Sequence, residues 1–274
     1  GLGSATGLED LPGEASGILP TPEWKKELNT VLINRKYDRL REELEAKYRE
    51  LQDQAADEEE RARLQKQFEQ EQRSLEARYR IDLNFETTWQ AFDTYNTSIG
   101  QGSNTYTMLQ LAHYVATLVN GGKRYKPYIV DSIYDEAGNL VKQFEPEEIV
   151  AEIPLSKDNL QTTVTAMLGT TQPGGTAWSL FRHFPEHIKV GAKTGTAETG
   201  LAGDGKKDFH GVFIAFAPAH DPQIAFAGIV EYGQSGSGSA GYVAKALFEE
   251  YFGLNDKDEE FSLPEEFYIE FPVE

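Results

Sequence analysis

Cysteine is absent from this sequence of 274 residues. Its absence excludes disulfides, thiolate zinc sites and cysteine nucleophiles. Long apolar runs are also missing: nowhere do about 18 apolar residues follow one another, so we expect no segment that spans a membrane. Basic residues are scarce, since 26 Lys and Arg face 45 Asp and Glu and leave a formal net charge of -19.

This charge balance limits the possible partners. Nucleic acid and anionic lipid both attract clusters of Lys and Arg. The acidic excess therefore argues against a nucleic-acid partner and against docking on an acidic membrane surface. We interpret it as a solvated surface that favours solubility.

The beginning of the chain has neither a starting Met nor the basic and apolar regions of a secretory signal. We therefore expect these residues to be part of a longer protein. The hydrophobic share of 39% is enough for a core, whereas the mean hydropathy of -0.52 requires a strongly polar segment.

A stretch without Gly or Pro, from about residue 34 to residue 80, supplies that polar segment. Its apolar residues recur at spacings of three and four, as in a coiled coil. Asp57, followed three residues later by Glu60, resembles a capping box that starts a second helix. We predict an antiparallel helical hairpin over 35–55 and 57–80, with one continuous helix as the alternative, and we see no internal repeat. Just before it, Thr21 and Pro22 favour the start of a helix.

The remaining pattern mixes helices and strands. We predict helices over 104–120, 155–170 and 242–251 from their apolar spacing and glycine stops. We predict a hairpin of strands over 128–134 and 140–144, and three further strands over 189–197, 211–217 and 224–232. Residues 233–241 have the composition of a flexible Gly/Ser linker, and residues 255–274 form an acidic tail.

The tripeptide Lys193-Thr194-Gly195 is the strongest chemical signal. It lies late in a predicted strand, which would suit the edge of a cleft. Lys193 would place a cation beside an anion or a proton-transfer site, and the hydroxyl groups of Thr194 and Thr196 can bind a carboxylate. Gly195 removes a side chain, so a substrate backbone can lie against the strand. On its own, the triplet would also fit an exposed edge lysine that discourages aggregation.

The same triplet is one of three motifs of penicillin-binding proteins and serine β-lactamases, together with Ser-x-x-Lys and Ser-x-Asn/Asp. Other stretches resemble the class B, monofunctional penicillin-binding proteins in wording and order: Gly1-Leu-Gly-Ser-Ala-Thr-Gly7, Leu11-Pro-Gly-Glu14, Leu19-Pro-Thr-Pro-Glu-Trp24, Thr97-Ser-Ile-Gly-Gln-Gly102, Leu109-Gln-Leu-Ala112, Asn120-Gly-Gly122, Gly175-Thr-Ala177, Lys193-Thr-Gly-Thr-Ala-Glu198 and Phe213-Ile-Ala-Phe-Ala-Pro218. They cover most of the chain outside the predicted helical hairpin and the acidic tail.

The resemblance implies a fold and a reaction. The fold would be the C-terminal portion of the penicillin-binding/serine β-lactamase-like transpeptidase fold, an α/β (α+β) arrangement of an antiparallel sheet with flanking helices. In the family, a serine attacks the D-Ala-D-Ala carbonyl of a peptidoglycan stem peptide, and an amine of a second stem then takes the acyl group. β-Lactams acylate the same serine. We expect neither a cofactor nor a metal.

The resemblance also implies roles for particular residues. Lys193 would assist proton transfer and attract the substrate carboxylate. The hydroxyl groups of Thr194 and Thr196 would bind that carboxylate along the Gly195 backbone. The backbone N–H of Thr196 would be one of two oxyanion-hole donors, each worth roughly 3–4 kcal/mol in the transition state. His210 matches a place where the family often has a polar residue beside the cleft.

Neither Ser-x-x-Lys nor Ser-x-Asn occurs at any serine of this sequence. In the family both precede the glycine-rich segment that is residues 1–7 here. We therefore expect the nucleophile to lie in an upstream half of the same protein, and this chain alone to be inactive. Ser235, Ser237 and Ser239 are not expected to act as nucleophiles, and His113, His183, His187 and His220 are expected to be surface or packing residues.

These observations predict four regions. Residues 1–33 start the transpeptidase fragment, 34–85 form the hairpin insertion, 86–254 complete the fragment, and 255–274 are the tail. The family joins Trp24 and Thr97 by a short connection, which favours a hairpin, because a rod of about 46 residues would separate its ends by roughly 70 Å. The family also implies a location on the outer face of the bacterial cytoplasmic membrane, with the anchor outside this chain.

Alternative functions remain open at this point. The chain could be a non-catalytic module that binds a cell-wall or division protein through the hairpin. A carboxypeptidase or β-lactamase is a further possibility, against which the class B-like stretches argue.

Overall fold

A computed structural model describes residues 1–149, 156–201 and 207–254, and the chain divides into two units. One unit contains residues 18–105, and the other contains residues 1–17 together with the chain from Tyr106 onward. The predicted acidic tail, 255–274, lies outside the described residues.

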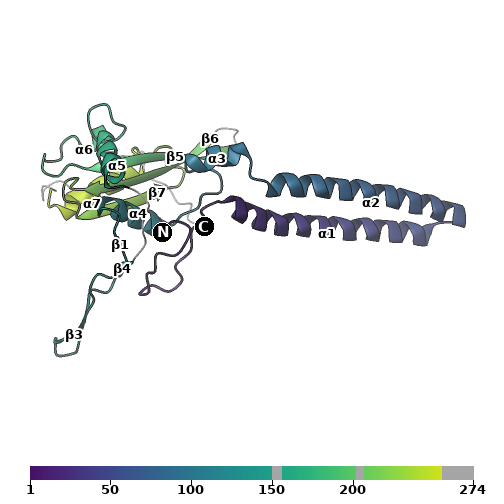
Figure 1. The fold of residues 1–274 in the computed structure, drawn as a ribbon, viewed down its shortest axis with the longest axis horizontal. Helices are drawn as coiled ribbons and strands as arrows, with labels where there is room; N and C mark the ends of the chain where they lie inside the picture. Colours follow the sequence, from purple (N-terminus) through teal and green to yellow (C-terminus); the bar gives the residue numbers. More distant parts are fainter. Residues whose placement is uncertain (150–155, 202–206, 255–274) are drawn as a thin grey trace, which may run out of the picture. The chain divides into compact units, whose positions relative to one another are not determined.

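The first of these units consists of two long helices and one short helix. Helix α1 (Pro22–Gln54) and helix α2 (Glu58–Thr87) lie side by side and antiparallel, and helix α3 (Ala91–Ser98) follows (Figure 1). The predicted hairpin is thus confirmed, and the alternative of one continuous helix is excluded. α1 begins twelve residues before the expected boundary at 34, because the Thr21 hydroxyl accepts a hydrogen bond from the backbone N–H of Trp24 at 3.1 Å.

The turn between the helices is built by the predicted acidic cap. The Asp57 carboxylate accepts from the N–H of Glu60 at 2.8 Å, and the Glu60 carboxylate accepts from the N–H of Ala56 at 2.9 Å. The reciprocal bond therefore reaches one residue further back than in a standard capping box.

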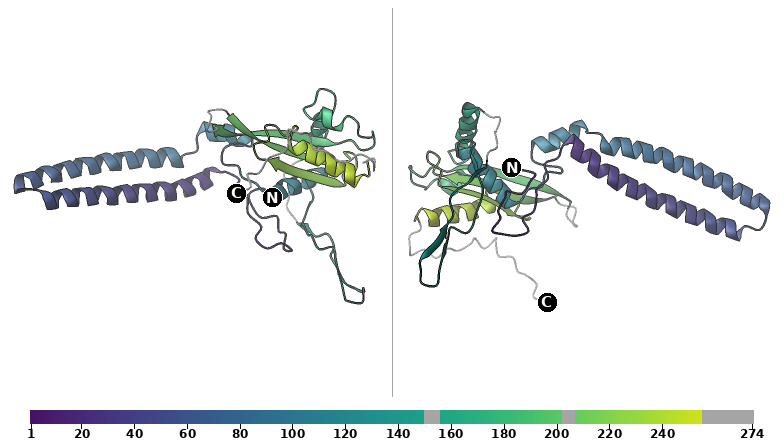
Figure 2. Two further views of the ribbon diagram at one scale, coloured as in Figure 1. Left: turned by 180° about the vertical axis from the view of Figure 1, so that it is seen from behind. Right: turned by 60° about the horizontal axis from the view of Figure 1, so that its bottom comes forward.

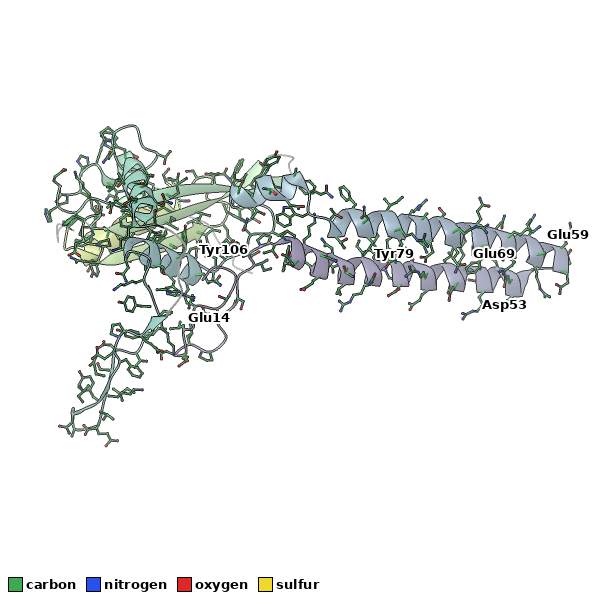
Figure 3. All side chains as sticks on the ribbon, in the orientation of Figure 1. Glu14, Asp53, Glu59, Glu69, Tyr79 and Tyr106 are labelled. Carbon is green, nitrogen blue, oxygen red and sulfur yellow. The ribbon has the colours of Figure 1, made fainter. Side chains whose placement is uncertain are left out.

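The hairpin contains a repeat of eleven residues, so the expectation of no internal repeat was wrong. Three lysines eleven residues apart form ion pairs with three acids eleven residues apart in the opposite direction: Lys25–Asp93 at 2.6 Å, Lys36–Asp82 at 2.9 Å and Lys47–Glu71 at 3.0 Å. Two tyrosines follow the same repeat. Tyr37 packs on Tyr79 with ring centroids 5.3 Å apart, and Tyr48 packs on Phe68 at 5.4 Å. Tyr79 is labelled between the two long helices in Figure 3.

Eleven residues make three turns of 3.67 residues, close to the 3.6 of a straight α-helix. Equivalent side chains therefore stay on the face between α1 and α2 from the Lys47–Glu71 pair to the Lys36–Asp82 pair, whereas the acid that pairs with Lys25 comes from α3. The apolar pattern did not reveal the repeat, because most of its members are charged.

The second unit is built on a three-stranded antiparallel sheet. Strands β5 (Gly191–Leu201), β6 (Lys207–Ala217) and β7 (Ile224–Val230) lie in the order β5-β6-β7. Helices α4 (Met108–Val119) and α5 (Lys157–Gly169) pack on one face, around Val115, Met167 and Phe216. Helices α6 (Trp178–Phe181) and α7 (Ala240–Tyr251) pack on the other face (Figures 1 and 2). Phe213 and Phe248 are fully buried there.

Helix α4 begins at Met108, four residues after its expected start. The Thr107 hydroxyl accepts from the N–H of Gln110 at 3.1 Å, and the Gln110 side chain accepts from the N–H of Thr107 at 2.8 Å. This capping box sets the start. Gly121, with φ 67°, lies just beyond the helix and ends it as predicted.

Two small antiparallel pairs complete the second unit. Strands β1 (Arg124–Tyr125) and β4 (Glu148–Ile149) pair with each other, as do β2 (Ser132–Tyr134) and β3 (Leu140–Gln143). The β2–β3 pair is the predicted hairpin, and every residue of β3 is exposed. Among the described residues, no helix is both long enough and apolar enough to cross a bilayer.

Candidate functional site

Strand β5 carries Lys193-Thr194-Gly195 at one edge of the sheet, with β6 on its inner side. Lys193 pairs with Ile214, and Thr194 pairs with Phe213. Directly paired residues share a face of the sheet. Because Phe213 packs with α6 and α7, Thr194 and Thr196 lie on that face, whereas Lys193 and Gly195 lie on the face of α4 and α5.

The Lys193 side chain is exposed, and its Nζ donates to the backbone carbonyl of Thr194 at 2.6 Å. The ammonium group therefore lies next to the tripeptide's own backbone. Thr196 is also exposed. The structure thus places the predicted cation and the predicted hydroxyl groups on one edge strand, with Lys193 on one face of the sheet and Thr194 and Thr196 on the other.

Thr194 has a partner that the sequence analysis did not assign to the site. Its hydroxyl lies 3.1 Å from the hydroxyl of Thr176. The N–H of Ala177, the next residue, donates to the carbonyl of Thr170 at 2.9 Å, and Ala177 is fully buried. A side chain at Gly175 would collide with the backbone of α5's last turn. Thr176 is therefore presented by a tightly packed turn, and its presence in the family-like stretch Gly175-Thr-Ala177 was the available signal.

His210 lies on β6 opposite Ala197, one pair beyond Thr196 and Gly211. Its Nδ1 accepts from the backbone N–H of Tyr232 at 3.1 Å, and its ring packs edge-on against the Tyr232 ring at 5.2 Å. An imidazole that accepts at Nδ1 carries its proton on Nε2 when it is neutral. The structure thus places His210 beside β5, opposite the second residue after the tripeptide.

The turn after β7 holds two residues in the left-handed region. Tyr232 has φ 57° and Gln234 has φ 61°, and neither is a glycine. Such backbone conformations cost energy and concentrate at functional sites. No sequence pattern pointed to this turn.

The Gly/Ser segment after this turn is a packed element, so its interpretation as a flexible linker was wrong. Ser239 is buried, and its hydroxyl donates to the carbonyl of Ser235 at 2.5 Å. The Ser235 hydroxyl accepts from the N–H of Gly238 at 3.1 Å. The small residues allow the segment to lie directly on the sheet. The Gly/Ser composition of the segment does not by itself reveal this packing.

The remaining candidates lie apart from this strand. His183 accepts from Arg182 Nε at 2.9 Å, and His113 Nε2 donates to the carbonyl of Tyr125 at 2.6 Å. Ser156-Lys157-Asp158 has the spelling of Ser-x-Asp, but the Ser156 hydroxyl caps α5 by accepting from the N–H of Asn159 at 3.1 Å. In the described ranges, no group of three or more His, Asp or Glu side chains could hold a metal ion.

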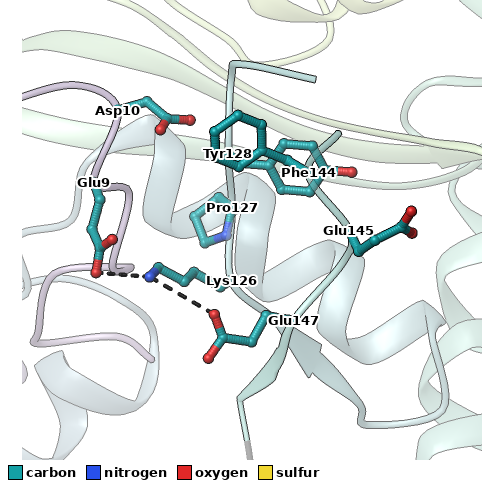
Figure 4. Close-up of a pocket in the computed structure, with 8 residues that line it drawn as sticks. All are labelled: Glu9, Asp10, Lys126, Pro127, Tyr128, Phe144, Glu145 and Glu147. Atoms are coloured by element: carbon teal, nitrogen blue, oxygen red, sulfur yellow. Dashed lines mark ion pairs between the residues drawn. The ribbon is translucent and has the colours of Figure 1, made fainter. Parts of the chain in front are cut away.

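A small pocket at the base of the β2–β3 hairpin shares no residue with the tripeptide strand (Figure 4). Lys126 lies between Glu9 and Glu147 and forms ion pairs with both, at 2.7 Å and 3.9 Å. The Asp10 carboxylate accepts from the N–H groups of Ile129 at 2.7 Å and Val130 at 3.2 Å, and these bonds lower the pKa of Asp10. These contacts hold Glu9 and Asp10 against the segment that leads into the β2–β3 hairpin.

Comparison with known proteins gives a consistent result. The family model of the penicillin binding protein transpeptidase domain matches residues 1–252. The chain is 32% identical over 170 residues to penicillin-binding protein H of Bacillus subtilis, covering 58% of this chain and 23% of that protein. It is 28% identical over 269 residues to the peptidoglycan D,D-transpeptidase MrdA of Acinetobacter baumannii, covering 91% of this chain and 29% of that protein.

Solved structures agree on the fold. Penicillin-binding protein 2B of Streptococcus pneumoniae matches with a TM-score of 0.50 and 25% identity, covering 62% of this chain and 28% of that chain. PBP2 of Pseudomonas aeruginosa, in complex with WCK 5153, matches with a TM-score of 0.59 and 22% identity, covering 93% of this chain and 42% of that chain. The chain spans about a quarter of the length of the curated relatives it matches.

The match over residues 1–252 includes the edge strand with its Lys-Thr-Gly tripeptide, the turn that presents Thr176 and the packed Gly/Ser segment. The predicted class is thereby confirmed: this chain belongs to the penicillin-binding protein transpeptidase family.

Proposed function

We propose that this chain supplies the Lys-Thr-Gly wall of a serine-type peptidoglycan D,D-transpeptidase, while the nucleophile comes from an upstream half of the same protein. The arrangement of β5 carries the proposal. Lys193, Thr194 and Thr196 stand together on an open strand edge, and the Thr194 hydroxyl is already oriented by Thr176 at 3.1 Å.

The substrate in this proposal is a stem peptide that ends in D-Ala-D-Ala. Its backbone runs along β5 beside Gly195, and its carboxylate binds the hydroxyl groups of Thr194 and Thr196 next to the Lys193 ammonium. The upstream serine attacks the carbonyl carbon of the penultimate D-Ala. The N–H of Thr196 stabilises the oxyanion that forms, terminal D-Ala leaves with a proton, and the amine of a second stem takes the acyl group. β-Lactams acylate the same serine.

Labelling by a fluorescent penicillin tests this proposal. The full-length protein should form a covalent adduct on a Ser-x-x-Lys serine located upstream of Gly1, and peptide mapping should locate it there. The chain of residues 1–274 alone should remain unlabelled. Labelling of the isolated chain, or a full-length protein that never acylates, would overturn the proposal.

Lys193→Ala provides the residue-level test. It should lower the acylation rate by at least tenfold, because the cation that attracts the carboxylate and assists proton transfer is lost. Lys189→Ala is the matched control, since Lys189 precedes β5, is exposed and pairs with Glu186. An equal effect of both substitutions would argue against a specific role for Lys193.

A second role is proposed for the helical hairpin, as a docking arm for a helix of another cell-wall protein. A groove between α1 and α2 supports it, lined by Leu40, Leu44 and Leu75 and bordered by charged residues. An amphipathic partner helix could lay its apolar face into such a groove. Leu44→Asp should abolish capture of the partner without changing penicillin labelling, whereas unchanged capture would contradict the docking role.

A further inference from the structure

The Gly/Ser loop, residues 232–239, packs against the strand pair that carries the tripeptide. Gly211 pairs with Thr196. A side chain at Gly211 would collide with the hydroxyl of Ser239 and would come within 2.5 Å of the carbonyl of Ser235. The loop therefore covers β6 directly behind Thr196.

Within the loop, Gly236 makes the closest approach to the backbone of the tripeptide. It is buried, and a Cβ atom there would collide with the carbonyl of Val212 and would lie 2.8 Å from the carbonyl oxygen and 3.0 Å from the nitrogen of Gly195. Val212 is the β6 partner of Gly195. Gly236 thus rests on the backbone of the tripeptide's own glycine.

The contact falls between the two threonines proposed to bind carboxylate. Side chains alternate along a strand, so Thr194 and Thr196 point to the face opposite that of Gly195. The loop, like Thr194 and Thr196, lies on the α7 face, because Ser239 covers Gly211 and precedes α7. Gly236 therefore occupies the space above Gly195 that the flanking threonines border.

The loop is held in this place from both ends. The N–H of Gln234 donates to the carbonyl of Phe209 on β6 at 3.1 Å, and the N–H of Gly241 in α7 donates to the carbonyl of Gly236 at 2.8 Å. The Ser239 hydroxyl closes the loop on Ser235. Two residues in the left-handed region, Tyr232 and Gln234, complete the fixed path. An element with this many constraints transmits a displacement instead of absorbing it.

We propose that Gly236 is a positioning residue for the transpeptidase site. Its contact with the Gly195 backbone sets the distance between the loop and residues 194–196 of β5. That distance determines where the Thr196 N–H and the two threonine hydroxyl groups lie. This inference rests on the proposed function. A donor in an oxyanion hole acts over a narrow range of distances, and a displacement of about 1 Å can lower the rate by roughly a hundredfold. Only glycine fits at position 236, because a side chain there would collide with the backbone of Val212 and Gly195.

Gly236→Ala in the full-length protein tests the proposal. A fluorescent penicillin reports two quantities: the rate constant of acylation and the final fraction of molecules labelled. We expect the rate constant to fall by roughly 10- to 100-fold, while the final fraction stays that of the parent protein. A purely structural role would do the opposite, because it would reduce the fraction of active molecules and leave their rate unchanged. That result, or an unchanged rate, would overturn the inference.

Gly238→Ala is the matched control in the same loop. A Cβ atom at Gly238 would meet only the Ser235 side chain, whose hydroxyl oxygen would lie 2.6 Å away. We expect its acylation rate to stay within about threefold of the parent. If both alanine variants slow acylation equally, the effect does not belong to the Gly236 contact and the inference fails.

Ser239→Ala keeps the test decisive if Gly236→Ala does not fold. It removes the bond to the Ser235 carbonyl without adding an atom, so the loop loosens but nothing collides. We expect a slower acylation at full final labelling, and an unchanged rate would contradict the inference. The parent protein separates the two proposals: if it is never labelled, the proposed function fails, whereas if it is labelled and the variants match its rate, only the positioning role fails.

Discussion

At the scale of single residues, the site depends on contacts between residues that the sequence keeps apart. Thr176 and Thr194 are eighteen positions apart, and their hydroxyl groups lie 3.1 Å from each other. His210 and Tyr232 meet across the ends of β6 and β7. The sequence identified Lys193, Thr194, Gly195, Thr196 and His210 by type. Tyr232 came only from the fold, and Thr176 was marked only by its place in the family-like stretch Gly175-Thr-Ala177, because the partner of each residue lies on another element.

Thr176→Val tests the contact with Thr194. Valine keeps the shape of threonine and removes the hydroxyl, so the Thr194 hydroxyl loses its orienting partner. A neutral hydrogen bond contributes about 1 kcal/mol, which corresponds to a roughly fivefold slower acylation by penicillin in the full-length protein. Thr163→Val is the control, because the Thr163 hydroxyl bonds only within its own helix, to the carbonyl of Asn159 at 2.9 Å. Equal rates for Thr176→Val and the parent would contradict the orienting role.

His113 predicts a dependence of stability on pH. Burial lowers its pKa from the ordinary value of 6.5, and the charge of Arg124 adds to this, whereas the hydrogen bond to Tyr125 and the charge of Glu14 oppose it. The folded state therefore keeps His113 neutral in a range where the unfolded state binds a proton. Its contribution is fully present above about pH 6.5 and is lost as the pH falls below that value toward the folded pKa.

Urea unfolding of the full-length protein and of His113→Gln measures this contribution, because glutamine keeps a side-chain donor for the Tyr125 carbonyl and does not titrate. The free energy of unfolding of the parent, relative to the variant, should decrease between about pH 7.5 and about pH 5.5. A constant difference over this range would show that His113 titrates alike in both states.

At the scale of elements, caps and stops determined where helices begin and end. Thr21, Asp57 and Thr107 each accept the hydrogen bond that begins a helix, and two of these starts were readable in advance. Helices α3 and α6 and the short strands β1 and β4 were not predicted. They are too short to display a period, and their existence depends on neighbours supplied by the fold.

The eleven-residue repeat of the helical hairpin can be tested by deletion. Deleting 37–47 from α1 together with 72–82 from α2 removes one repeat from each helix. Lys36 then precedes Tyr48 and faces Glu71, as Lys47 did. The hairpin should fold with a length about 16 Å shorter and with its helical circular dichroism per residue unchanged.

A deletion of nine residues from each helix, 37–45 and 74–82, is the control. Nine residues correspond to two and a half turns, so the outer halves of both helices would turn their packed faces outward. This variant should lose helical signal and melt at a lower temperature. If it behaves like the eleven-residue deletion, the repeat does not determine the pairing of the helices.

At the scale of the whole molecule, the two units divide the proposed roles. Every residue assigned to the site, together with the helices and the loop that support it, lies in the unit that contains residue 106 onward. The ends of the hairpin are close together, since the Asn29 side chain donates to the carbonyl of Glu86 at 2.8 Å. The hairpin is thus an insertion whose removal need not disturb β5.

Replacing residues 30–85 with a short Gly/Asn turn tests this division. In the full-length protein, we expect the rate of penicillin acylation to stay within about twofold of the parent. Binding to a partner through the hairpin should be lost, as measured by co-purification from the native host. A loss of acylation in a folded variant would assign the hairpin to the catalytic machinery instead.

The residue chemistry, the family and most helices and strands can be predicted from the chain alone, because motifs, caps and apolar periods involve neighbouring residues. How these parts contact one another depends on the fold. A string of glycine and serine has the composition of a flexible linker, yet the missing side chains are what allow Gly236 to rest on Gly195. Lys25, Lys36 and Lys47 look like a solvated surface until the fold brings an acid to each of these three. Such contacts join residues far apart in the chain, so they exist only once the chain has folded.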